Sequence, residues 1–317
     1  MIFLDAPATR NALPFDRLIE AIRCLFVTGC EVPMRHHHTI TLPDGSTGTT
    51  LLMPAWQSDG YYGVKTVNIF PANATRGLPA LHSTYLLYDT ATGQPLAQID
   101  GNEITSRRTV AASALAASFL ARPDARTLLV VGTGRVALLT AEAYRAVLPI
   151  RTVLVWGRQP AQASAMAARL AADLQGQGVD VQAVTDLAAA ARQADIVSCA
   201  TLATAPLIDG RWLREGSHLD LIGSFTPAMR EADDACFAGA SLFVDTDEAL
   251  TKSGDLLGPM ARGVFSAADV RGTLAGLCRG DVPGRQSPQE RTVFKSVGTA
   301  LEDLAAASLV YRSTQPS

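Results

Sequence analysis

The sequence LLVVGTGRVA at residues 128–137 decides the fold of this chain. Its run of apolar residues is typical of a strand that is buried on both faces of a parallel sheet. The pattern G-x-G-x-x-A ends this strand and precedes a segment with helical spacing, which is the context of a dinucleotide-binding turn. Gly132 allows the tight turn, Gly134 lets the backbone approach a pyrophosphate, and Ala137 lets the helix pack closely on the strand. The N–H groups at the positive end of that helix would hold the phosphates.

Strands and helices alternate after this turn, as they do in a doubly wound α/β fold. Apolar runs predict strands at 128–132, 153–156, 179–184, 196–200, 218–223, 242–245 and 292–297. Helical spacing predicts helices at 135–148, 160–175 and 186–193. We therefore expect a Rossmann dinucleotide-binding domain over residues 110–297.

The amino-terminal part of the chain follows a different pattern, with a period of two from residue 33 to about 100. The segments HTITL, TGTTLLM, YGVKTVNIF and STYLLYD read as strands without helices between them, which predicts an antiparallel or mixed sheet. An Ala-rich helix over 107–121, capped by Ser106 or Thr105, leads into the second domain.

The fold class that follows is α/β, with a smaller α+β substrate and dimerisation domain beside the Rossmann domain. That smaller domain spans residues 1–109 and is completed by residues 298–317. An amphipathic helix over 299–312 is expected to pack back on it, because nothing after residue 312 could cover its apolar face.

The end of the second Rossmann strand predicts the cofactor. NAD enzymes usually place an acid there to bind the ribose hydroxyls. This chain has Gly157 and Arg158 instead. Gly157 leaves room and Arg158 offers a cation to a 2′-phosphate, so NADP(H) is preferred and NAD(H) stays possible. The alternative is that Arg158 is a solvated surface residue.

Composition excludes several functional classes. The chain has 317 residues, of which 48% are hydrophobic and 18% are charged, and its net charge is −3. These values suit two cored domains and give no reason to expect binding to nucleic acid or a membrane. The amino terminus lacks the pattern of a signal peptide, and the five scattered cysteines suggest buried free thiols in a reducing cytoplasm.

Histidines offer two further candidates. His36, His37 and His38 follow one another on a predicted strand, where only His36 and His38 share a face. Two ligands make a poor metal site, so no metal is predicted. His82 is a candidate substrate contact, with a hydrogen-bonded structural role as the alternative.

Three cations precede the Rossmann domain: Arg35 near a strand start, Lys65 within the strand YGVKTVNIF, and Arg108 in the first turn of the Ala-rich helix. Taken singly, each suits a solvated surface position. However, the neighbours of Lys65 are mostly apolar, and Arg108 opens the helix that leads into the dinucleotide domain.

The sequence around these cations resembles that of the ornithine cyclodeaminase/μ-crystallin family. The matching stretches are Met53-Pro54-Ala55, GVKTVNIFPAN around Lys65, GLPALH (77–82), TGQPLAQIDGNEITSRRTVAASALAA (92–117), VVGTGRVA, CATLATAPLI, SGDL (253–256) and TVFKSVGTALEDLAAA. They occur in order over nearly the whole chain. The resemblance implies a homodimer with an amino-terminal substrate and dimerisation domain and a Rossmann domain.

The resemblance also implies roles for individual residues. Arg35, Lys65 and Arg108 would hold a substrate carboxylate, with Lys65 also placed for acid–base chemistry. The predicted cofactor-binding residues are Gly132, Thr133, Gly134, Arg135, Val136, Gly157, Arg158, Ala200, Thr201, Gly223 and Ser296.

One departure bears on the reaction. In the cyclodeaminases of this family, the segment that corresponds to DLIGSFTPAMRE (220–231) has an aspartate where this chain has Phe225. Phenylalanine cannot pair with an ammonium group, but it can form a wall for an apolar ring. The segment resembles that of the family's Δ1-pyrroline-2-carboxylate reductases.

We therefore expect NAD(P)H-dependent reduction of Δ1-pyrroline-2-carboxylate or Δ1-piperideine-2-carboxylate to L-proline or L-pipecolate. The alternatives are ornithine cyclodeaminase, which converts L-ornithine to L-proline and ammonia, a related amino-acid dehydrogenase, and a non-enzymatic binding protein of the μ-crystallin type.

Overall fold

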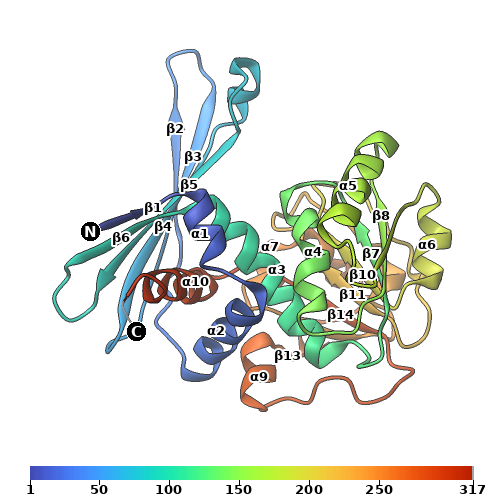
Figure 1. Cartoon of the computed structure of the whole chain (residues 1–317). Coiled ribbons are helices and arrows are strands. Elements are labelled where there is room, and N and C mark those ends of the chain that lie inside the picture. The colour runs from blue at the N-terminus through green and yellow to red at the C-terminus, as the bar shows by residue number, and fades with distance from the viewer. Residues whose placement is uncertain (316–317) are drawn as a thin grey trace. The chain divides into compact units, whose positions relative to one another are not determined.

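The computed structural model describes residues 1–315, apart from the side chain of Ala74. The chain divides into two compact units. Unit 1 contains residues 1–108 and the carboxyl-terminal residues from Thr299 onward, and unit 2 contains residues 109–298. The predicted fold class is confirmed, because one unit contains a parallel Rossmann sheet and the other a separate mixed sheet (Figure 1).

Unit 1 is built on a six-stranded sheet with the order β1-β6-β5-β4-β3-β2. Its strands are β1 (Ile2–Leu4), β2 (His36–Thr41), β3 (Thr47–Trp56), β4 (Tyr61–Ile69), β5 (Leu81–Asp89) and β6 (Pro95–Asp100). Strand β1 runs parallel to β6 and the other neighbours are antiparallel, which confirms the mixed sheet. The sequence patterns did not predict β6 as a separate strand.

Helix α10 (Ala300–Arg312) covers one face of this sheet, and α2 (Phe15–Thr28) packs on α10 (Figure 1). A short helix, α1 (Ala6–Asn11), and a 3₁₀ turn, η1 (Pro71–Arg76), complete the unit. Helix α10 packs on α2 and on the central strands, and nearly all of its residues are buried. The prediction of an amphipathic helix was therefore wrong, because even the two acids in its first turn are inside.

Unit 2 contains eight parallel strands in the order β13-β12-β14-β11-β10-β7-β8-β9. The strands are β7 (Thr127–Val131), β8 (Thr152–Trp156), β9 (Asp180–Ala183), β10 (Ile196–Cys199), β11 (His218–Leu221), β12 (Ser241–Val244), β13 (Val270–Thr273) and β14 (Thr292–Lys295). Each predicted strand is present. Edge strand β13 was missed, because its sequence VRGT has no apolar run.

The helices of unit 2 alternate with these strands along the chain and flank the sheet (Figure 1). They are α4 (Arg135–Arg145), α5 (Pro160–Asp173), α6 (Leu187–Gln193), α7 (Ala249–Lys252), α8 (Gly254–Ala261) and α9 (Leu274–Arg279), with 3₁₀ turns η2 (Gly210–Trp212), η3 (Asp234–Cys236) and η4 (Ala267–Asp269). Strand β7 lies between β8 and β10, so the strand order changes direction beside it. In such sheets a ligand binds where the strands end next to this point, which is where Gly132 follows β7.

Helix α3 (Gly101–Leu120) begins earlier than predicted. The Asp100 carboxylate accepts a hydrogen bond of 2.8 Å from the Glu103 N–H, and this contact caps the helix six residues before the predicted start. Arg108 consequently lies two turns inside the helix and not in its first turn. Among residues 1–315, no helix is both long and apolar enough to cross a lipid bilayer.

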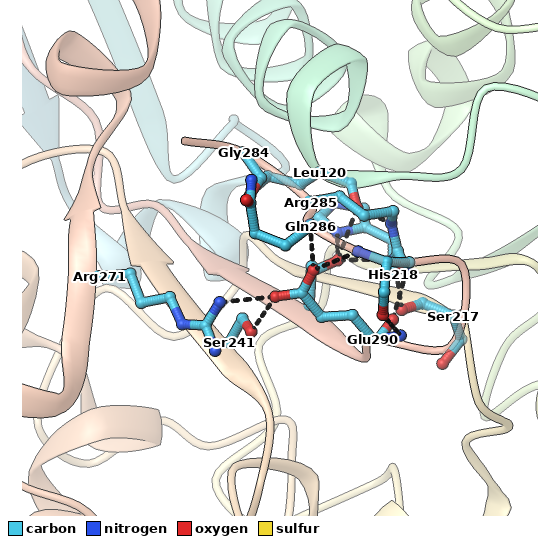
Figure 2. Close-up of polar contacts among 11 residues, drawn as sticks. Leu120, Ser217, His218, Ser241, Arg271, Gly284, Arg285, Gln286 and Glu290 are labelled. Atoms are coloured by element: carbon cyan, nitrogen blue, oxygen red, sulfur yellow. Dashed lines mark hydrogen bonds and ion pairs between the residues drawn. The ribbon is translucent and has the colours of Figure 1, made fainter. Parts of the chain in front are cut away.

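The edge at which the parallel strands begin is held by a polar network (Figure 2). Arg285 donates hydrogen bonds to the carbonyl oxygens of Leu120 at 2.7 Å and Ser217 at 3.1 Å. Glu290 accepts from Arg271 at 2.7 Å and from the Ser241 hydroxyl. These contacts join the segments that enter β11, β12, β13 and β14, so the network stabilises the sheet at the edge opposite to Gly132.

The cysteines depart in part from expectation. All five are free thiols, but only Cys199 and Cys236 are buried, and Cys24 is exposed.

Candidate functional site: a dinucleotide cradle and a buried ion cluster

The turn after β7 is formed by backbone that only glycine permits at Gly132. Its φ is 126°, and a Cβ atom there would lie 2.5 Å from the carbonyl oxygen of Ala200. Gly134 is the N-cap of α4 and has no side chain to satisfy the first N–H groups of that helix. A Cβ at Gly134 would meet nothing within 4 Å. The start of α4 is therefore open to an anionic ligand.

A hollow of about 530 Å³ adjoins this turn. It is lined by Thr133, Gly134, Arg135, Leu138, Gln162, Ala165, Met166 and Arg169. Two guanidinium groups and no acid are among these lining residues, and the Thr133 hydroxyl donates to Gln162 at 3.2 Å across the start of α5. The charge of the hollow suits a phosphate-bearing ligand.

At the end of β8, close packing requires glycine at position 157, in addition to the space that glycine leaves for a ligand. Gly157 is buried, and a Cβ there would lie 2.6 Å from Cγ2 of Thr133. The next residue, Arg158, is exposed, and no side-chain hydrogen bond or ion pair of Arg158 is found within the described part of the chain. Its guanidinium is thus available to a ligand or to solvent.

The other predicted cofactor residues lie where strands end. Ala200 and Thr201 follow β10, Gly223 follows β11 after Ile222, and Ser296 follows β14. The Ser296 N–H donates to the carbonyl oxygen of Leu221 at 3.2 Å. The sheet therefore brings segments far apart in sequence to the edge where Gly132 lies.

Unit 1 contains a buried ion cluster around Lys65. Lys65 lies on β4, and its Nζ is 2.8 Å from Oδ1 and 2.7 Å from Oδ2 of Asp303 on α10. Arg108 donates from Nε to Asp303 Oδ1 at 2.9 Å and from Nη1 to Glu302 Oε2 at 2.7 Å. Two cations and two acids thus meet inside the unit, where their charges balance.

Burial sets the protonation of this cluster. It lowers the pKa of Lys65 to about 8, although Asp303 opposes the shift. Burial also opposes ionisation of Asp303, but the adjacent Lys65 and Arg108 charges outweigh it and hold the pKa of Asp303 below its usual range. Lys65 is therefore mostly a cation at neutral pH and loses its proton at a mildly alkaline pH. A lysine of this kind is suited to proton transfer.

Other predicted residues lie apart from Lys65 or on a separate segment. His82 is exposed and lies on β5, three positions before Tyr85. Tyr85 is the residue that pairs with Lys65 on the neighbouring strand β4. Residues of opposite parity face opposite sides of a sheet, so His82 lies on the other face from Lys65. Arg35 is partly buried in the connection before β2. Phe225, in unit 2, is 48% exposed in the segment after β11.

The histidine run forms part of β2, all of whose residues are exposed. The rings of His36 and His38 lie 6.3 Å apart. Within residues 1–315, no three His, Cys, Asp or Glu side chains are grouped so that they could hold a metal ion.

Sequence reasoning missed Glu302 and Asp303. Acids in the first turn of a helix normally indicate a solvated start that favours the helix dipole. The available signal was their place in ALEDLAAASLV, where almost every other residue is apolar. A charged pair in such a segment requires buried partners.

Comparison with known proteins adds the following findings. The model of the ornithine cyclodeaminase/mu-crystallin family matches residues 12–317. A Δ1-pyrroline-2-carboxylate reductase of Paracoccus denitrificans is 47% identical over 312 residues, which are 98% of this chain and 96% of the relative. The structure of the Thermococcus litoralis Δ1-pyrroline-2-carboxylate reductase in complex with NADH and L-proline has a TM-score of 0.90 and is 32% identical, covering 98% of this chain and 97% of that one. An archaeal alanine dehydrogenase dimer with bound NAD has a TM-score of 0.87 at 28% identity, over 98% and 94% of the two chains.

Proposed function

The chain belongs to the ornithine cyclodeaminase/mu-crystallin family, which includes NAD(P)-dependent imine reductases and alanine dehydrogenases, and from this we propose that it reduces a cyclic imino acid. The substrate is Δ1-pyrroline-2-carboxylate or its six-membered homologue, and the product is L-proline or L-pipecolate. The observation that carries the proposal is the buried Lys65, whose Nζ lies 2.8 Å from Oδ1 of Asp303 beside the Arg108 guanidinium.

Reduction of a C=N bond adds a hydride to carbon and a proton to nitrogen. A bound dinucleotide supplies the hydride, and Gly132, Gly134 and the start of α4 are the groups that would hold its pyrophosphate. The Lys65 ammonium holds the proton at Nζ and gives it to the ring nitrogen of the substrate. The Asp303 carboxylate then favours the return of a proton to the neutral Lys65 amine.

Arg108 binds the substrate carboxylate in this proposal. Its Nε and Nη1 donate to Asp303 and Glu302, and Nη2 makes no hydrogen bond to the described residues. The two acids fix the guanidinium plane, so Nη2 is oriented before substrate binds. Arg35 provides the second cation for the carboxylate.

Phe225 favours a reductase over a cyclodeaminase. A phenyl ring that is 48% exposed is available to an apolar substrate ring but cannot pair with the amino group of ornithine. His82 is not retained as a substrate contact beside Lys65, because it lies on the opposite face of the sheet.

We propose NADPH as the preferred cofactor, on the evidence of the exposed Arg158 and the absence of an acid from Val155 to Gln162. The solved relatives contain NADH or NAD, so the preference is proposed for this chain alone.

The chain is proposed to act as a homodimer through unit 1. The alanine dehydrogenase relative is a dimer. The edge strand β2 is exposed throughout, and Phe3 on β1 is 72% exposed. Light scattering should give twice the 33.4 kDa chain mass.

The test of the proposed function is the oxidation of NADPH with Δ1-pyrroline-2-carboxylate, with L-ornithine plus NAD⁺ as the contrast. We expect turnover with the imino acid and none with ornithine. Ammonia release from ornithine, without imine reduction, would instead identify a cyclodeaminase.

A further inference from the structure

A fully buried acid of unit 2, Glu231, joins the segments that follow two neighbouring strands. One of its carboxylate oxygens, Oε1, accepts from the Thr201 N–H at 2.7 Å and from the Thr201 hydroxyl at 2.8 Å. The other, Oε2, accepts from the Gly223 N–H at 2.6 Å. Thr201 follows β10 and Gly223 follows β11, so one carboxylate ties together two strand ends at the edge of the sheet that carries the dinucleotide turn.

The fit around this carboxylate is close. A Cβ atom at Gly223 would lie 2.1 Å from the carbonyl oxygen of Thr201 and 2.4 Å from Oε1 of Glu231. The residue before Thr201, Ala200, has its carbonyl oxygen against Gly132 in the same manner. The Glu231 contacts are therefore continuous with the turn that would hold the pyrophosphate.

The backbone of Glu231 is itself fixed by a second buried acid, Asp255. Its own N–H and that of Ala232 both donate to Oδ1 of Asp255, at 2.8 and 3.0 Å. Asp255 in turn donates its N–H to the Ser224 hydroxyl at 3.0 Å. The acid thus cannot move without disturbing the segments on both sides of it.

We propose that Glu231 is a positioning residue for the dinucleotide, because its carboxylate fixes the Thr201 and Gly223 backbones beside the Gly132 turn that would hold the pyrophosphate. The inference rests on the proposed binding of a dinucleotide at this edge. It concerns cofactor affinity and not the choice of imino acid.

The protonation of Glu231 provides a readout that a purely structural acid would not give. Burial raises the pKa of Glu231 to about 7, with Lys295 opposing and Asp255 reinforcing the shift. The buried Cys199 thiol also interacts electrostatically with Glu231. Protonation removes the charge that strengthens these contacts, and the oxygen that carries the proton becomes a poor acceptor for an N–H. Above a pH of about 7 the ionised Glu231 makes all its contacts with Thr201 and Gly223, and below it protonation weakens one of them. Dinucleotide affinity should therefore fall as the pH is lowered.

The control is Asp195, which also binds two backbone N–H groups, at the opposite edge of the sheet, and whose other oxygen, Oδ1, pairs with Arg122 and Arg214. Its Oδ2 accepts from the backbone N–H groups of Arg126 at 2.8 Å and Thr127 at 2.9 Å, where β7 begins. Asp195 therefore also stabilises backbone between neighbouring segments, but it lies away from the cofactor edge.

The experiment measures the Kd of NADH and of NADPH by nucleotide fluorescence from about pH 6 to about pH 8.5, in the wild type, Glu231→Gln and Asp195→Asn. Glutamine keeps the shape of Glu231 but turns an NH₂ group toward one of its donors. We expect Glu231→Gln to raise the Kd about tenfold at the alkaline end, the loss of about one hydrogen bond to a charged group, and to abolish the pH dependence. Asp195→Asn should lower the melting temperature and leave the Kd unchanged.

Three results would overturn the inference: a wild-type Kd in Glu231→Gln, an equal rise in Asp195→Asn, or a wild-type Kd that does not vary with pH. The last measurement needs no variant, so it holds even if Glu231→Gln does not fold. A wild type that binds neither dinucleotide would overturn the proposed function along with this inference. A wild type that binds dinucleotide normally but reduces no imino acid would overturn only the substrate assignment.

Discussion

Each unit contains one fully buried lysine, and the two are held in different ways. Lys65 of unit 1 contacts both carboxylate oxygens of Asp303. Lys295 of unit 2 donates to the carbonyl oxygen of Leu221 at 2.9 Å, and no ion pair of Lys295 is found within residues 1–315. Burial lowers the pKa of both, and nearby acids oppose the shift in each.

The acids around the two lysines explain the difference. Most carboxylate oxygens near Lys295 accept hydrogen bonds from other donors, although Oδ2 of Asp255 accepts none within the described residues. Asp220, for example, accepts from the hydroxyls of Ser113 at 2.9 Å, Tyr144 at 2.8 Å and Ser198 at 2.6 Å. Asp303 instead takes its donors from Lys65 and Arg108. A lysine surrounded by mostly satisfied acids balances charge, whereas a lysine that is itself the donor to an acid can exchange its proton with a substrate.

The largest effect that this comparison predicts is the loss of Lys65. Lys65→Ala should lower kcat/KM for imine reduction at least about a hundredfold, the low end for loss of an acid–base group. The Kd of NADPH should not change, because Lys65 belongs to unit 1. Steady-state kinetics and nucleotide fluorescence give the two values.

Lys295→Met is the matched control for that variant. It should lower the melting temperature, because several buried acids lose a nearby cation, but kcat at saturating cofactor should stay within a few-fold of the wild type. If both lysine variants lost catalysis equally, the distinction between the two would be wrong.

Arg108 should mainly affect substrate binding. Arg108→Leu removes the proposed carboxylate contact and should raise KM by about ten- to a hundredfold, the range of a hydrogen bond between charged groups. Arg108→Lys should rescue it poorly, since an ammonium cannot keep the Glu302 and Asp303 contacts and also offer a fixed third donor. An unaltered KM in the leucine variant would exclude this role.

The pKa of Lys65 predicts the pH profile. The proton donor must be protonated, so kcat/KM should be level below the pKa of about 8 and fall about tenfold per pH unit above it. Lys65→Arg keeps a cation that does not titrate in this range, so its residual activity should lack the alkaline limb. A limb that persists in Lys65→Arg would assign the titration to another group.

The same comparison shows which features a sequence reveals. The glycine turn after β7 and the strands around it are local patterns, in which a buried strand runs directly into glycines, and their structure was predicted correctly. The Lys65 cluster depends on residues 238 positions apart, and no local pattern reports such a contact. The acids of α10 have the spacing of a solvated helix start, and only the packing of that helix against the sheet shows that they are buried.

Helix α3 shows a second kind of limit. Asp100, Thr105 and Ser106 are all good capping residues, and local propensity does not choose among them. Gly101 and Asn102 are poor helix formers, so local propensity favours a helix that begins near residue 107. The structure selects Asp100, because β6 ends there and α3 follows without a connecting loop.

The smallest predicted effect concerns Arg158, which contrasts with both lysines because it is exposed and without a recorded partner among the described residues. An exposed cation is screened by solvent and salt, so its contact with a 2′-phosphate should contribute at the low end for charged hydrogen bonds, about tenfold in affinity. NADPH should accordingly be preferred to NADH by about that factor at low ionic strength, and by less as salt is added.

Arg158→Ala should remove most of the preference and leave NADH kinetics nearly unchanged, because NADH has no phosphate at that position. The measurement is kcat/KM for both cofactors at two salt concentrations. Equal values in the wild type, or an alanine variant that still prefers NADPH, would transfer the specificity to Arg135 and Arg169, the cations that line the neighbouring hollow.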